Sequence, residues 1–167
     1  AASDAGDSDA IAGTGRTDVI ALAPGANDAN WDAGIYQPVT VGDLVWNDTN
    51  ANGIQDSGEV GVDGVTVELF RSVDDSLVGT VTTAGGGLYS FTTVPGSYYL
   101  KFSGLTSGFV FTSSTASAAS DAGDSDAIAG TGRTDVIALA PGANDANWDA
   151  GIYQPAAVGN LVWDDAN

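Results

Sequence analysis

The stretch Val65-Thr-Val-Glu-Leu69 decides the fold class, because its apolar and polar residues alternate. Successive side chains of a β-strand point to opposite faces, so Val65, Val67 and Leu69 would share one buried face. Other segments with this two-residue period are separated by turns rich in Gly, Pro, Asn and Asp. The strands predicted in this way cover residues 41–46, 65–72, 77–83, 88–94, 98–103, 109–113, 135–139 and 148–153.

Seven or eight short strands within about 115 residues are typical of a two-sheet sandwich, so the sequence predicts an all-β fold. Helical periodicity with caps at both ends is absent from the sequence. Residues 113–130 are rich in Ser, Ala, Asp and Gly, and are predicted to form a loop.

The chain repeats itself, which defines its domain organisation. Residues 1–38 recur letter for letter as residues 118–155, an offset of 117, and the similarity continues to the end of the chain. A period of this length matches a domain rather than a solenoid turn. We therefore interpret residues 1–38 as the C-terminal part of a preceding repeat, 39–155 as a complete repeat, and 156–167 as the start of a following one. Short joints at Pro38 and Pro155 predict closely stacked tandem sandwiches.

Composition excludes several classes of function. The 167 residues include 22 acidic and 4 basic side chains, a formal charge of −18, and no His, Cys or Met. Catalysis by His or Cys, zinc fingers, haem and iron–sulfur clusters are thereby excluded. A metal site must use oxygen ligands, which suit Ca²⁺ and Mg²⁺. The charge disfavours nucleic acid, no apolar run is long enough for membrane insertion, and the missing Met suggests an internal fragment of a longer protein.

One window has the spacing of a calcium loop. In Asp48-Thr-Asn-Ala-Asn-Gly-Ile-Gln-Asp-Ser-Gly-Glu59, oxygen side chains fall at positions 1, 3, 5, 9 and 12, with glycine at the sharp turn of position 6. A metal-free turn rich in Asn, Asp and Gly is the alternative. Because predicted strands flank the window, we expect an EF-hand-like loop within a β-protein. The predicted ligands are Asp48, Asn50, Asn52, the carbonyl of Ile54, Asp56 and Glu59.

Two further acidic clusters lie late in the repeat, and each has an identical copy in the preceding one. Carboxylates this close in sequence repel one another unless a cation or solvent screens them. They are secondary metal candidates, with solvated loop charge as the alternative. Their members are Asp121, Asp124, Asp126, Asp145, Asn147 and Asp149, with the copies Asp4, Asp7, Asp9, Asp28, Asn30 and Asp32.

These motifs together resemble the SdrD B-like repeat domain of serine-aspartate repeat surface adhesins. The resemblance rests on residues 41–59 and 61–69, with Gly87-Leu-Tyr-Ser-Phe91, Gly96-Ser-Tyr-Tyr-Leu-Lys-Phe102, Asp124-Ser-Asp126 and Asp149-Ala-Gly-Ile-Tyr153. It implies an immunoglobulin-like or prealbumin-like sandwich related to collagen-adhesin B-type domains. It also implies more than one Ca²⁺ per repeat and a tandem arrangement on a cell surface. Some relatives carry a Lys–Asn isopeptide crosslink, which we do not expect here, because Lys101 falls in a late strand.

The sequence thus favours a calcium-stabilised structural repeat of a long extracellular protein, forming a stalk or a secreted filament. Its expected partners are neighbouring copies of the same repeat and other chains in a filament. The alternative is an adhesin module that binds a host or partner ligand through its sandwich loops. Near-identical repeats favour length or avidity over one specific pocket. No catalytic constellation accompanies the paired carboxylates, so we do not expect an enzyme.

Overall fold

A computed structural model describes residues 7–113 and 123–159 of the chain. Contacts divide the chain into two compact units, Ala1–Gln37 and Pro38–Asn167. Each unit is considered by itself. The predicted metal candidates Asp4 and Asp121, and most of the predicted third repeat, lie outside the described residues. Within the described residues, no helix has the length and hydropathy needed to cross a bilayer.

The described residues of the second unit form nine strands. Each of the eight predicted strands is present. The additional strand is β8, which the sequence analysis missed because two residues are too few to show an alternation of apolar and polar side chains. The three strands β6, β7 and β9 are also shorter than predicted. The strands are β1 (Val39–Asn47), β2 (Thr66–Arg71), β3 (Leu77–Thr82), β4 (Leu88–Thr93), β5 (Gly96–Ser103), β6 (Val110–Phe111), β7 (Ile137–Leu139), β8 (Asn144–Asp145) and β9 (Ala150–Tyr153).

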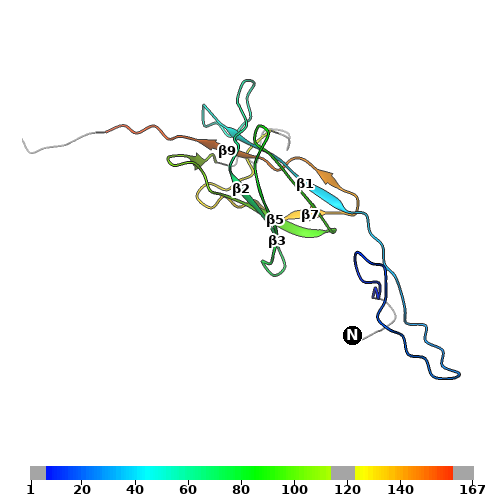
Figure 1. Cartoon of the computed structure of the whole chain (residues 1–167). Helices are drawn as coiled ribbons and strands as arrows, with labels where there is room; N and C mark the ends of the chain where they lie inside the picture. Colours follow the sequence, from blue (N-terminus) through cyan, green and yellow to red (C-terminus); the bar gives the residue numbers. More distant parts are fainter. Residues whose placement is uncertain (1–6, 114–122, 160–167) are drawn as a thin grey trace, which may run out of the picture. The chain divides into compact units, whose positions relative to one another are not determined.

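The strands form two sheets, as expected for a sandwich (Figure 1). One has the order β4-β1-β9-β6, and the other has the order β3-β2-β5-β7. Most neighbours are antiparallel, but β8 and β9 both run parallel to β1, with β8 beside Thr40 and β9 beside Val45. The late strands therefore complete a sheet that the first strand of the repeat begins.

The core lies between the two sheets. Val65, Val67 and Leu69 are all buried in it, as the alternation in the sequence predicts. Both early and late strands contribute to the same cluster, so neither half of the repeat buries its apolar face alone. Its largest fully buried members are Tyr98, Phe102, Leu69, Leu100, Ile137 and Ile152.

The three glycines at residues 85–87 form the turn between β3 and β4, and this turn requires glycine for two reasons. Gly87 has φ +87°, and a Cβ there would lie 2.2 Å from the carbonyl oxygen of Val45. The carbonyl of Gly87 accepts a hydrogen bond from the Val45 N–H (2.9 Å). The Asp63 carboxylate accepts the N–H groups of Gly86 and Gly87, and these bonds lower its pKa. The turn thereby brings β4 directly onto β1.

The first unit has the sequence of residues 118–154 but not their structure. Over residues 7–37 it contains no strand, whereas the same letters form β7, β8 and β9 in the second unit. Ile35 is 97% exposed, while its counterpart Ile152 is 1% exposed. The described residues of the first unit form no strand like β1 or β5 against which these side chains could pack.

Candidate metal centre

The predicted calcium loop begins where β1 ends, and Asp48 anchors it. The Asp48 N–H donates to the carbonyl of Ile152 on β9 (2.8 Å), and the side chain is fully buried. Its carboxylate accepts hydrogen bonds from the N–H groups of Gly53 (2.8 Å) and Asn52 (3.2 Å) and from the Thr112 hydroxyl (2.9 Å). Bonds to a charged acceptor are stronger than neutral ones, so this buried carboxylate holds the loop in a fixed turn.

Three of the predicted ligand side chains converge across the loop. The side-chain amides of Asn50 and Asn52 both donate to the same Asp56 oxygen, at 2.8 and 2.9 Å. The Asn50 oxygen accepts the Asn52 N–H (3.0 Å), and the Asn52 oxygen accepts the Ile54 N–H (2.7 Å). Positions 3, 5 and 9 of the loop are therefore already gathered around one point.

Glu59 closes the loop from its other end. One carboxylate oxygen accepts the N–H (2.7 Å) and the hydroxyl (3.0 Å) of Thr49, and the other accepts the Asp56 N–H (3.0 Å). Ile54 forms an isolated β-bridge with Asp124. The two hydrogen bonds of this bridge are made by the residues on either side of Ile54 and Asp124, not by these two residues themselves. The Ile54 carbonyl is therefore not used by this bridge. The loop is thus closed on itself and attached to the segment that follows β6.

The residues in this loop fit a hard cation in their donor chemistry. All six predicted ligands offer oxygen. The two asparagine oxygens accept main-chain N–H groups here, so a cation beside Asp56 would require both amides to turn over and give up those bonds. Carboxylates alone do not suffice, because no group of three or more Asp or Glu side chains in residues 7–113 and 123–159 is placed to hold a metal ion. A cation here must therefore take asparagine and main-chain oxygens as well.

Of the secondary candidates, the structure brings Asp124, Asp126 and Asp149 together. The Asp126 N–H donates to the Asp149 carbonyl (2.8 Å), and the Asp149 N–H donates to the Asp126 carboxylate (2.7 Å). Asp124 is 7% exposed, and one of its carboxylate oxygens is buried without a hydrogen bond. The pairing joins two clusters that lie 23 residues apart in the sequence.

Asp149 is the most perturbed carboxyl among the described residues. Burial, followed by the negative charge of Asp43, raises its pKa to about 8, and a hydrogen bond from the Leu44 N–H opposes the shift. Asp126 and Asp124 add to the repulsion. Burial also raises the pKa of Asp43. The neutral form of Asp149 is therefore favoured when no cation is nearby.

Asp43 belongs to this cluster, although the sequence analysis missed it. It lies inside β1 and faces Tyr89 on β4 across the sheet. The sequence did contain a signal for it, because Asp43 interrupts an otherwise mainly apolar strand. A half-buried carboxylate in such a strand needs a polar or charged partner. Tyr89 donates its hydroxyl to the Trp148 carbonyl, and burial and the surrounding carboxylates raise its pKa.

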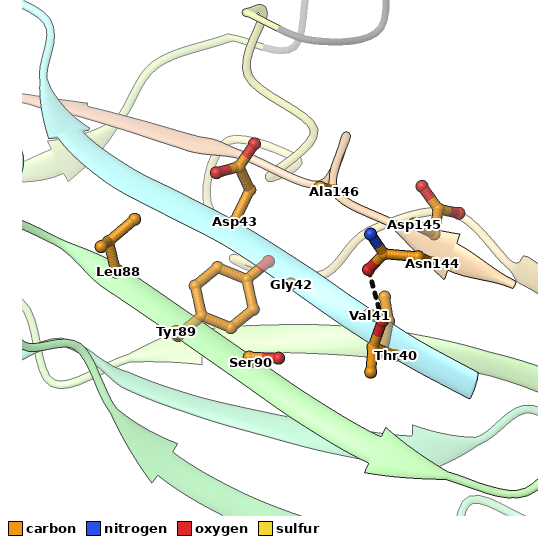
Figure 2. Close-up of a pocket in the computed structure, with 10 residues that line it drawn as sticks. All are labelled: Thr40, Val41, Gly42, Asp43, Leu88, Tyr89, Ser90, Asn144, Asp145 and Ala146. Atoms are coloured by element: carbon orange, nitrogen blue, oxygen red, sulfur yellow. Dashed lines mark hydrogen bonds between the residues drawn. The ribbon is translucent and has the colours of Figure 1, made fainter. Parts of the chain in front are cut away.

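The remaining secondary candidates are arranged differently. Figure 2 shows Asn144 and Asp145 on β8 beside Thr40 and Val41 of β1. Together with Asp43, which lies farther along β1, they line an open pocket of about 460 Å³. Thr40 donates its hydroxyl to the Asn144 side chain there. Asp145 accepts the indole N–H of Trp148 (2.9 Å), so it holds that side chain. The structure does not bring Asn147 into the group formed by Asp124, Asp126 and Asp149.

The copies in the first unit keep the same local contacts. The Asp9 N–H donates to the Asp32 carbonyl (2.8 Å), and the Asp32 N–H donates to the Asp9 carboxylate (2.9 Å). Asp28 accepts the indole N–H of Trp31 (2.9 Å) and the N–H of Asn30 (3.3 Å). Asp7, the copy of Asp124, is exposed.

Comparison with known proteins places these strands and this loop within one family domain. The family model for the SdrD B-like domain matches residues 39–152, which include all nine strands except the last residue of β9. The chain belongs to the SdrD B-like domain family. The match covers the calcium-loop window and the cluster around Asp149.

Two relatives of this SdrD B-like chain come from staphylococci. It is 36% identical over 167 residues to serine-aspartate repeat-containing protein D of Staphylococcus aureus (strain Newman), covering 97% of this chain and 12% of that protein. It is 37% identical over 147 residues to serine-aspartate repeat-containing protein F of Staphylococcus epidermidis (strain ATCC 12228 / FDA PCI 1200), covering 85% of this chain and 8% of that protein. The chain thus spans about an eighth or less of these relatives.

Proposed function

We propose that this chain is a calcium-stabilised structural repeat of a long extracellular surface protein, and that its repeats form a stalk or filament. The observation that carries the proposal is the convergence of Asn50, Asn52 and Asp56 within a loop anchored by the buried Asp48. The family supports the surface-protein part, because its relatives are named for repeats and share this domain. We assign no enzymatic activity to it.

The proposed ligands are Asp48, Asn50, Asn52, Asp56 and Glu59, with the carbonyl of Ile54. Bound Ca²⁺ would supply the positive charge that offsets the carboxylates of the loop. Hydrogen bonds within the chain already hold two of these ligand carboxylates in place. Asp48 is held by three donors before any ligand arrives, and Glu59 already spans the two ends of the loop.

Binding at this loop would stabilise the whole repeat because the loop joins distant segments. The Gln55 N–H donates to the Gly123 carbonyl (2.8 Å), and the Ser125 N–H donates to the Gly53 carbonyl (2.9 Å). Unfolding would separate these segments and destroy the site. A ligand that binds only the folded state adds RT ln(1 + [L]/Kd) to the free energy of unfolding.

The secondary candidates Asp124, Asp126 and Asp149 remain part of the proposal, as ligands that would need main-chain oxygens beside them, because no group of three acidic side chains among the described residues is placed to hold a metal ion. The raised pKa of Asp149 has burial and nearby carboxylates as its causes, and a cation would relieve both. The repeat from 39 to 155 has 14 acidic and 3 basic residues, a net charge of −11. Cations bound along a tandem array would reduce the repulsion within and between such repeats.

Thermal unfolding in calcium and in EDTA tests the proposal. Extracellular modules bind calcium with Kd around 10⁻⁴ M, so about 10 mM calcium would add roughly 2.7 kcal/mol at one site. For a unit of about 115 residues this raises Tm by roughly 11 °C. Magnesium is the ionic control, because it prefers a smaller octahedral site. Equal melting temperatures in calcium and EDTA would refute calcium stabilisation.

A matched pair of variants locates the effect in the loop. Glu59→Gln removes one carboxylate of the loop, whereas Glu68→Gln removes one from β2, which lies in the other sheet. In EDTA the first variant should cost about 0.5–1.5 kcal/mol, since it loses one acceptor for the Asp56 N–H. The calcium-induced rise in Tm should be lost in Glu59→Gln and kept in Glu68→Gln.

A further inference from the structure

One side of the complete repeat carries no charge. Residues 76–100 contain no Asp, Glu, Lys or Arg, although the repeat as a whole has a net charge of −11. This stretch includes β3, the glycine turn and β4, and the two strands lie at the ends of the two sheets. They also contact each other, so they form a single neutral edge of the sandwich. Repeats that repel one another elsewhere can approach most closely at such an edge.

The strand β3 has main-chain groups available for pairing with another strand. Among the described residues it pairs with β2 alone. The Thr83 N–H donates to the Val65 carbonyl (2.9 Å), and hydrogen-bonded positions alternate along an antiparallel pair. The N–H and C=O groups of Thr80 and Thr82 therefore point away from β2. Both of these threonines are exposed.

The usual protection of an edge strand is missing from β3. Natural sheets protect their edges with Lys, Pro or inward-pointing charges, and residues 77–82 contain none of these. The register with β2 shifts between Leu69 and Phe70, opposite the first residues of β3. The regular part of the edge therefore covers residues 79–82, which include both outward-facing threonines.

We propose that β3 pairs antiparallel with β3 of a second copy of this chain, which joins two four-stranded sheets edge to edge. The pairing is two-fold symmetric about Val81, so Thr80 of each copy lies opposite Thr82 of the other. This centre uses both outward-facing threonines and leaves the register shift outside the paired residues. Threonine pairs across two strands are themselves favourable.

The distribution of charge favours this arrangement. Within each sheet Glu68 lies between Thr80 and Lys101, so a basic residue is already beside it. The two copies of Glu68 would be separated by three strand spacings, at least about 14 Å. That distance exceeds the Debye length of about 8 Å at physiological salt, so they repel only weakly. The acidic loop at residues 74–75 of each copy would lie toward residues 87–88 of the other, far from its own counterpart.

Pairing of this kind would hold stalks or filaments side by side. A single pair of short strands is weak, but a tandem array with the 117-residue period would present the edge once per repeat, and contacts in register reinforce one another. The inference rests on the proposed stalk or filament for its setting and does not depend on calcium binding. Added NaCl should strengthen the association, because it screens the repulsion between acidic repeats.

Disulfide trapping tests the pairing directly, since the chain has no cysteine of its own. One chain carries Thr80→Cys, and a second chain with a larger tag carries Thr82→Cys. In the proposed register these positions form a hydrogen-bonded pair with Cα atoms about 5.5 Å apart, which a disulfide can span. The matched control replaces Thr82→Cys by Ser97→Cys, which is also exposed but lies on β5, two strands from the edge.

The folded chains are mixed in a glutathione redox buffer with NaCl, once with calcium and once with EDTA, and separated on a non-reducing gel. We expect about tenfold more mixed dimer than in the control, which corresponds to about 1.4 kcal/mol. The excess should be present in both buffers, so a failed calcium effect on Tm and a failed pairing are distinguishable. Equal yields for the test pair and the control pair would overturn the proposal.

A second substitution in the Thr80→Cys chain identifies the surface that is used. Thr82→Pro removes an N–H that points away from β2, so it should abolish the excess of mixed dimer while a melting curve shows that the chain is folded. Thr82→Lys should lower the yield as well, because lysine at an edge strand opposes pairing. Lysine also makes the chain less negative, so association governed by net charge alone would increase instead. An increase with Thr82→Lys, or an undiminished yield with folded Thr82→Pro, would overturn the proposal.

Discussion

The buried carboxyl of Asp149 should make the calcium-free protein less stable at neutral pH than at acidic pH. Its side chain is 2% exposed, and its pKa is raised from 3.8 to about 8 by burial and by Asp43. The fold therefore favours the protonated form. Between the unfolded and folded pKa values, each pH unit costs about 1.4 kcal/mol of stability. The loss begins near pH 4 and is complete near pH 8.

The perturbation that isolates this effect is Asp149→Asn. The amide oxygen can still accept the Leu44 N–H (3.1 Å), and the amide nitrogen can donate to a neighbouring carboxylate. At pH 7 the penalty removed is at most about 4 kcal/mol, and relaxation of the surrounding carboxylates reduces it, so we expect a gain of roughly 2–4 kcal/mol. For a unit of this size that raises Tm by about 8–16 °C.

The assay is thermal unfolding in EDTA at several pH values between 4 and 8, for the native protein and the variant. Relative to the native protein, the variant should be more stable at pH 7 and about equally stable at pH 4. Near pH 4 the Asp149 carboxyl is protonated in the folded state and only partly ionised in the unfolded state, so it contributes little difference between them. If Asp149 also holds a cation, added calcium should shrink or reverse the gain. A variant that is equally stabilised at every pH, or is destabilised at pH 7 in EDTA, would refute the reasoning.

Three other substitutions test the packing and the loop anchor by equilibrium unfolding. Ile152→Ala should cost about 2–5 kcal/mol and Ile35→Ala less than about 0.5, although the two residues have the same sequence neighbours, because only Ile152 is buried; equal costs would contradict the assigned packing. Gly87→Ala should cost about 1–3 kcal/mol more than Gly85→Ala, since both have positive φ but only Gly87 meets a backbone oxygen; similar losses would contradict that close approach. Thr112→Val should cost roughly 1–3 kcal/mol by removing a donor from the buried carboxylate that begins the loop; an unchanged stability would show that this bond contributes nothing.

Local alternation was enough to predict most of the fold. Val65, Val67 and Leu69 share a face because a strand has a period of two, and this property does not depend on the rest of the chain. The loop spacing from Asp48 to Glu59 was equally local, and the structure gathers its side chains within hydrogen-bonding distance. Patterns that lie within a few residues can therefore be interpreted without knowledge of tertiary contacts.

Pairings between distant segments could not be predicted in this way. Thr112 anchors Asp48 from 64 residues away, and nothing around Thr112 in the sequence indicates that role. The short strand β8 is defined only by its parallel pairing with Thr40 and Val41. Asp43 joins Asp149 because β1 and the late strands share a sheet. The identical copy in the first unit shows the same limit, because the same letters form strands in the second unit and none over residues 7–37.

The most direct test of the central claim is a calcium titration followed by amide NMR, which resolves the loop residue by residue. The amide resonances of residues 48–59 should shift and saturate together, led by Gly53, whose N–H donates to the Asp48 carboxylate (2.8 Å). The glycine turn of residues 85–87 should remain unchanged. Loop resonances that do not move at about 10 mM calcium would contradict the account, because sites of this class are mostly filled at that concentration.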